Sequence, residues 1–134
     1  VTPIAGTWTP SFTFATPGDL AVTYAAQTGN WTLIGGRICI VDFNITTSAF
    51  TFTTASGNLI IGTLPQTIAA ISVGKIAWGG ITKATYTEIG LSASSGTTAT
   101  LVASGSGVAR TTVTAADTPT GGTIRLSGCV IYLV

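Results

Sequence analysis

The sequence contains no histidine and no methionine, and charged residues are scarce. Charged side chains make up 7% of the 134 residues, against about 25% in an average soluble domain. Without histidine, a Ser-His-Asp or Cys-His mechanism is excluded. Two cysteines without histidine do not suggest a zinc site either. We therefore predict a protein that is not an enzyme, with no catalytic residues, no metal site and no cofactor.

The few basic residues form no cluster, and the net charge is only +1. They are Arg37, Lys75, Lys83, Arg110 and Arg125. Neutral stretches separate them, so the chain has no basic stripe that would neutralise phosphates, and nucleic acid is not an expected partner. Apolar runs are also short. None approaches the roughly 18 consecutive residues that a membrane-spanning helix needs, so we expect no membrane insertion.

Four carboxylates remain as possible acids or bases. Asp19 follows Pro17 and Gly18, and Asp117 precedes a Thr-Pro pair, so both are expected to bond within turns. Asp42 and Glu88 fall in expected strands. Because a glycosidase needs only two carboxylates about 5 to 10 Å apart, a polysaccharide depolymerase that uses Asp42 and Glu88 stays open as an alternative. The long repetitive solenoid that such enzymes usually have is not evident in this sequence.

Alternation of apolar and polar residues dominates the chain and predicts short strands. Threonine, a β-branched residue with a hydroxyl, suits the exposed face of such strands. Trp8, Phe12 and Phe14 share one face of a first strand that Pro10 marks as an edge or an interruption. Further strands are expected near 21–26, 31–34, 37–46, 58–64, 68–73, 86–93, 98–103, 108–114 and 123–134, with turns at glycine-rich positions such as Gly29-Asn30 and Gly79-Gly80.

Short strands with glycine-rich turns and no sustained helical period favour an all-β fold. We predict one domain over 1–134, an antiparallel β-sandwich or jelly roll. Within Ile38–Ile45 the apolar face changes phase between Ile40 and Val41, which predicts a central strand with a bulge or with both faces buried. The last residues are apolar on both faces, so this end must be covered, by the sandwich or by a threefold axis.

Three aromatic residues beside expected turns are candidates for ligand contact: Trp31, Trp78 and Tyr86. Flat rings next to polar groups suit carbohydrate recognition, and residues near turns carry function more often than strand residues do. The alternative for each is packing at a corner of the fold. Cys39 and Cys129 both lie in apolar runs, where free cysteines are commonly buried. A disulfide between them would need Cα atoms within about 7 Å, and the sequence leaves this open.

Several motifs recur in an order that resembles a known family. They are Gly6-Thr-Trp-Thr-Pro10, Val22-Thr-Tyr24, Gln27-Thr-Gly29, Trp31-Thr-Leu-Ile-Gly-Gly-Arg37, Thr53-Thr-Ala-Ser-Gly57, Gly62-Thr-Leu-Pro65 and Leu126-Ser-Gly128. This series is similar to the C-terminal module of bacteriophage and prophage tail-fibre proteins. The chain departs from the usual pattern at Trp31 and Leu33, where that family commonly has Tyr and Lys.

The resemblance implies a homotrimeric tip of a virion fibre that binds a bacterial surface glycan or an envelope protein. It also implies that 1–134 is the C-terminal part of a longer fibre protein, assembled in the bacterial cytoplasm together with other virion proteins. The low charge fits self-association, because few ions must be desolvated when identical subunits meet. A capsid decoration or head-fibre protein is the structural alternative.

Overall fold

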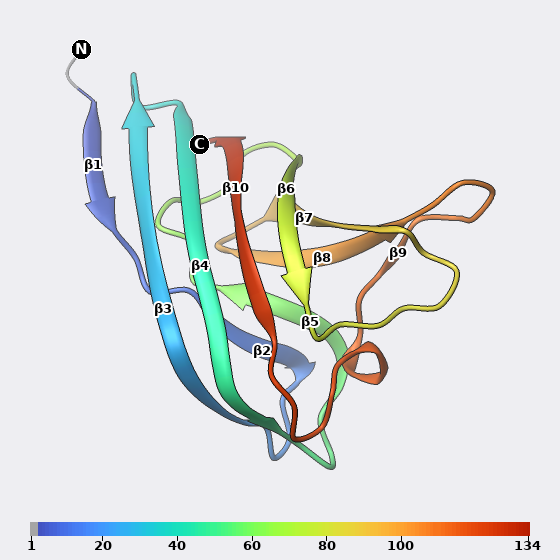
Figure 1. Cartoon of the computed structure of the whole chain (residues 1–134). Coiled ribbons are helices and arrows are strands. Elements are labelled where there is room, and N and C mark those ends of the chain that lie inside the picture. The colour runs from blue at the N-terminus through green and yellow to red at the C-terminus, as the bar shows by residue number, and fades with distance from the viewer. Residues whose placement is uncertain (1–2) are drawn as a thin grey trace.

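The computed structural model describes residues 3–134, and nearly all of its regular structure is antiparallel β-strand (Figure 1). The strands are β1 (Ile4–Thr7), β2 (Ser11–Thr16), β3 (Ala21–Ile34), β4 (Ile38–Thr51), β5 (Ser56–Gly62), β6 (Ser72–Gly79), β7 (Glu88–Ser95), β8 (Thr98–Ser104), β9 (Thr111–Thr112) and β10 (Arg125–Leu133). A short 3-10 helix, Ala115–Asp117, interrupts the last connection. The predicted all-β, antiparallel fold is confirmed.

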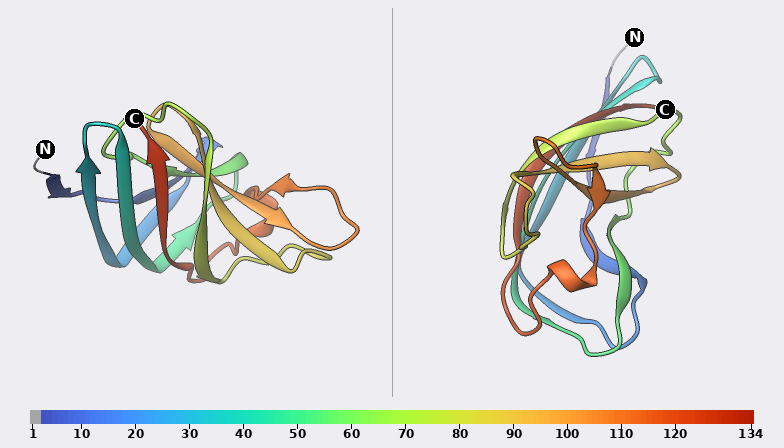
Figure 2. Two further views of the ribbon diagram at one scale, coloured as in Figure 1. Left: turned by 90° about the horizontal axis from the view of Figure 1, so that it is seen from above. Right: turned by 90° about the vertical axis from the view of Figure 1, so that its right-hand side faces the viewer.

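Within residues 3–134 the ten strands form one sheet, in the order β1-β3-β4-β10-β6-β7-β8-β5-β2, with β9 paired to β8. The sheet curls like half of a barrel. Its two ends therefore face each other, with β2 and β5 lying opposite β3 and β4 across the core (Figure 2). The two layers expected of a sandwich are thus parts of one continuous curled sheet.

Aromatic side chains close this curl. Phe12 and Phe14 on β2 pack edge-to-face against Phe50 on β4, with ring centroids 6.0 and 5.8 Å apart. The hydroxyl of Tyr24 on β3 accepts a hydrogen bond of 2.7 Å from the backbone N–H of Phe12. The prediction that Phe12 and Phe14 share one face of their strand is therefore correct. Their contacts with Phe50 join β2 to β4, which are not paired by backbone hydrogen bonds.

Strand β4 lies in the middle of the larger layer, between β3 and β10, as expected. Cys39, Val41, Phe43 and Ile45 point into the core, and the residues between them face outward. The sequence predicts either a bulge between Ile40 and Val41 or burial of both faces, and neither occurs. Pairing with β3 runs through these positions without a shift, and Ile38 on the outer face is exposed. The apolar residues that alternate with the buried ones, Ile38 and Ile40, lie on the outer face of the sheet.

The turn predicted at Gly29-Asn30 is also wrong, because β3 runs straight through it. The cause is a contact distant in sequence. Trp8 follows β1 just before Pro10 interrupts the chain, and its indole lies over Gly29, where a Cβ atom would sit 2.4 Å from Nε1. The indole N–H donates a 3.1 Å hydrogen bond to the carbonyl of Asp42. Gly29 thus makes room for a ring within a strand.

Several expected strands differ in extent from the observed ones, and the strand expected at 37–46 continues to Thr51. The strand expected at 68–73 is displaced to β6, where alternation is hard to detect because the inward position 74 is glycine. The strand expected at 86–93 begins only at Glu88. The strand expected at 108–114 is reduced to the two residues of β9, and most of that stretch is irregular.

The two cysteines lie on adjacent strands but on opposite faces. Cys39 is buried, Cys129 is exposed, and both are free. Cys129 pairs with Asp42 on β4, three positions from Cys39, so the two thiols point to opposite sides of the sheet. Among the described residues no three metal-ligating side chains gather into a possible metal site, and no helix is long and apolar enough to cross a membrane.

Candidate functional site

The outer face of β6, β7 and β8 carries a hollow of about 370 Å³. Its floor is Gly90 on the middle strand, which pairs with Lys75 on β6 and with Val102 on β8. Because Gly90 has no side chain between these neighbours, the surface is depressed there. Glu88, two positions along β7, lies on the same face, opposite Ser104. The absence of one side chain in the middle strand thus creates the hollow.

Charge is concentrated in this hollow. Lys75, Glu88 and Arg110 all line it, although the whole sequence has only five basic and four acidic residues. None of these three side chains forms a hydrogen bond or an ion pair with another protein group within residues 3–134; the ion pair present there joins Lys83 to Asp117. Two cationic groups and one carboxylate, all exposed to solvent, therefore share one small depression.

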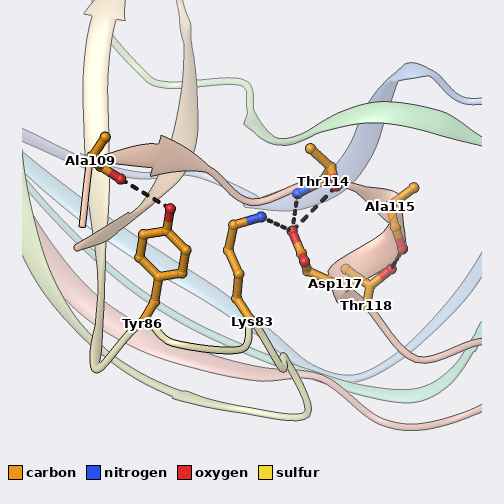
Figure 3. A network of polar contacts seen from close by, with 7 residues as sticks. All are labelled: Lys83, Tyr86, Ala109, Thr114, Ala115, Asp117 and Thr118. Carbon is orange, nitrogen blue, oxygen red and sulfur yellow. Dashed lines mark hydrogen bonds and ion pairs between the residues drawn. The ribbon is translucent and has the colours of Figure 1, made fainter. Parts of the chain in front are cut away.

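Two polar contacts fix the loops that border the hollow (Figure 3). The hydroxyl of Tyr86 donates a 3.0 Å hydrogen bond to the carbonyl of Ala109, the residue before Arg110. The ammonium of Lys83 donates a 2.7 Å hydrogen bond to Asp117. The first contact holds the backbone that carries Arg110, and the second joins the β6–β7 loop to the 3-10 helix. The backbone position of Arg110 is thus set by the fold.

Asp117 is the central acceptor of this network. Its carboxylate accepts hydrogen bonds from the backbone N–H and the hydroxyl of Thr114, as in a capping box, as well as from Lys83. Burial opposes ionisation of this group, but the hydrogen bonds from Lys83 and Thr114 outweigh burial and hold the pKa of Asp117 below its ordinary value. Asp117 serves as a structural anchor, as its turn position predicts.

The three aromatic residues singled out from the sequence do not converge. Trp31 lies within β3, half-buried against the core, with its indole over Gly6. Trp78 lies at the end of β6 with 38% of its surface exposed. Tyr86 does not line the charged hollow, but its hydroxyl bonds the carbonyl of Ala109, next to Arg110, and the ammonium of Lys83 lies 5.8 Å from its ring centroid. Of the three, Trp78 offers the most open ring.

Asp42 and Glu88 do not lie on neighbouring strands. Asp42 lies on β4 and Glu88 on β7, with β10 and β6 between them. Three strand spacings therefore separate their backbones, which is about 14 Å along the sheet.

A second feature of the outer face is an apolar patch at the end of the sheet where β10 ends. Its members are Ile34, Ile38, Ile71, Val73, Ile131 and Leu133, all exposed. Ile34 pairs with Ile38, and Ile38 with Leu133, so three strands present the patch side by side. Ile71 is 72% exposed and Ile131 is 53% exposed. Exposed apolar side chains gathered in this way are typical of an interaction surface.

Sequence reasoning did not identify Lys75 and Arg110 as site residues, and it considered Glu88 only as a catalytic acid. One local signal was available. A glycine in the interior of a strand, as at Gly90, often marks a place where a ligand or another backbone approaches closely. The partners of Gly90 across the sheet are set by pairing between distant segments, and no local pattern reveals them.

Comparison with known proteins gives one structural match to report. No protein-family model matches the sequence, and no curated protein matches it. The crystal structure of the Dettilon tailspike protein (gp208) superposes with a TM-score of 0.63 at 16% sequence identity. The match covers 98% of this chain and 24% of that chain, so this chain spans about a quarter of the length of that tailspike. At this identity, the likeness is one of fold.

Proposed function

We propose that this chain is a bacteriophage tail module that assembles as a homotrimer and attaches the virion to the host cell surface. The observation that carries the proposal is the fold shared with part of a tailspike protein over 98% of the chain. The ordered series of motifs that resembles tail-fibre modules, from Gly6 to Gly128, is independent support. Other virion proteins would then be its partners, and a bacterial surface glycan or envelope protein its target.

The apolar patch supports assembly with identical copies. All six of its side chains are uncharged, so three copies can bring it together without like-charge repulsion or desolvation of ions. The patch includes the outer face of β10, and the sequence predicts that both apolar faces of this strand must be covered. The inner face of β10 is covered by the core, through Val130 and Tyr132. In the proposed trimer, the outer face, with Ile131 and Leu133, is covered by the neighbouring subunits.

The charged hollow and the exposed aromatics are the proposed contacts with the target. Trp78 has an open ring that lines a shallow pocket with Arg125 and Ser127, and the ring of Tyr86 lies beside the ammonium of Lys83. An aromatic ring next to polar groups is the combination that binds carbohydrate. Trp31 stays in the proposal through the exposed part of its half-buried indole. The three residues lie on separate parts of the surface, so we expect substitutions at each to affect attachment to different extents.

Binding to intact bacteria tests attachment. The purified chain, labelled at its N-terminus, is incubated with a panel of strains, each paired with an isogenic strain that lacks its surface polysaccharide. We expect saturable binding to at least one strain and loss of that binding in its polysaccharide-deficient partner or after removal of outer-membrane proteins. The same chain unfolded in urea and diluted under non-refolding conditions is the control for adhesion. Equal binding to every strain and by the unfolded control would contradict the proposal.

A further inference from the structure

We infer that the hollow on β6, β7 and β8 binds a carboxylate-bearing sugar unit. The anion-binding part of this inference rests on the residues of the hollow alone, and the choice of a saccharide rests on the proposed function. The hollow measures about 370 Å³, at the lower end of the roughly 300 to 1,000 Å³ of small-molecule sites. It therefore suits one small unit of a polymer.

The charged groups select the class of ligand. The guanidinium of Arg110 has the planar pair of donors that matches a carboxylate, and the ammonium of Lys75 adds a second positive charge to the same depression. Neither cation is neutralised by Glu88, since no ion pair joins them. With two positive charges and one negative, the hollow favours a ligand that carries one anionic group.

The remaining lining suits the rest of a sugar ring. Glu88 and its cross-strand partner Ser104 accept and donate hydrogen bonds, which hydroxyl groups on a ring require. Gly90 leaves a flat floor of backbone, with the apolar side chain of Val102 beside it for the C–H face of the ring. Tyr86 holds the backbone next to Arg110 in place through Ala109, so binding has to order the Arg110 side chain but not the loop that carries it.

Matched monosaccharides separate the possible ligand chemistries. Methyl glucuronide carries the carboxylate, methyl glucoside is its neutral counterpart, and inorganic phosphate is an anion without a ring. Titrations are followed through the amide NMR signals of Gly90 and its neighbours. We expect the glucuronide to shift these signals and saturate, with affinity about tenfold or more above the glucoside, because a bidentate carboxylate contact is lost in the neutral sugar. Binding of phosphate as tight as that of the glucuronide, or no shift with any probe, would overturn the inference.

Two variants test the location. Gly90→Val leaves the net charge unchanged but fills the floor of the hollow. Arg110→Gln removes the guanidinium that would bind the ligand's carboxylate, and because this side chain forms no hydrogen bond or ion pair within residues 3–134, we expect the fold to be kept. We expect both to abolish the shifts caused by the glucuronide. Arg37→Gln, which removes the same charge from the β3–β4 turn, is the control and should bind as the wild type does. Equal weakening by Arg110→Gln and Arg37→Gln would show diffuse attraction and refute the site, even if Gly90→Val failed to fold.

The inference and the proposed function fail separately. If the labelled chain binds bacteria but Arg110→Gln binds equally well, the attachment role stands and the hollow is not its site. If the hollow binds the glucuronide but the chain binds no bacterium, the inferred site stands and the proposed attachment role falls.

Discussion

The contact between Trp8 and Gly29 gives the sharpest test of the packing, through the substitution Gly29→Ala. A Cβ atom at this position would lie 2.4 Å from the indole Nε1 and 2.7 Å from Cδ1, so the ring must move. Trp8 is only 9% exposed, and its N–H bonds the carbonyl of Asp42 at 3.1 Å. Overpacking costs about 1–3 kcal/mol, and the lost hydrogen bond adds about 0.5–1.5 kcal/mol. We therefore expect Gly29→Ala to lower the free energy of unfolding by about 1.5–4.5 kcal/mol.

Equilibrium unfolding in urea, at one fixed protein concentration because assembly would shift the midpoint, measures this loss. Gly79→Ala is the matched control, since nothing lies within 4 Å of a Cβ atom there. We expect that control to change the free energy of unfolding by less than about 1 kcal/mol. Tryptophan fluorescence of folded Gly29→Ala should also shift to longer wavelength as Trp8 becomes more exposed. A stability equal to that of Gly79→Ala would refute the packing argument.

Three further predictions concern single polar groups. Tyr132→Phe removes a hydroxyl that bonds the backbone of Gln66 in both directions, and we expect unfolding in urea to show a loss of about 1–3 kcal/mol; an unchanged midpoint would contradict this. Hydrogen bonds from Thr53, first through its hydroxyl, hold the pKa of Asp19 well below its ordinary 3.8. This stabilisation is complete above that ordinary value and is lost as pH falls toward the lower folded-state pKa, so the stability difference from Asp19→Asn should shrink below about pH 4; a difference that is constant from pH 7 to pH 2 would be the opposing result. Burial raises the pKa of the Cys39 thiol, so in Cys129→Ser a thiol reagent should react with the protein only after unfolding; reaction of the folded variant would place Cys39 at the surface.

Local alternation was enough to predict much of the fold. Strand β2 shows it clearly, because Phe12 and Phe14, which the alternation assigns to one face, are both buried in the core. The interruption at Pro10 was predicted for the same reason, since a missing backbone N–H is a local property. Such features depend on the residues themselves and on their immediate neighbours.

Features that depend on distant contacts could not be predicted in this way. The pair Gly29-Asn30 is typical of a turn, yet it lies inside strand β3, where the indole of Trp8 occupies the space that a side chain at position 29 would need. The hollow is similar, since Lys75, Glu88 and Arg110 meet only through the pairing of β6, β7 and β8. Sequence patterns do not specify the order of strands in a sheet of ten, and this order determines which side chains share a surface.

The mass of the chain in solution, measured by light scattering coupled to size exclusion, tests the proposed fibre assembly most directly. We expect about 40 kDa, three copies of a 13.5 kDa chain, for the wild type. Ile131→Lys, in the apolar patch, should give a folded monomer, whereas Ile4→Lys, equally exposed on β1 but outside the patch, should remain a trimer. A wild-type mass near 13.5 kDa at micromolar concentration, or a trimer that Ile131→Lys leaves intact, would contradict the account.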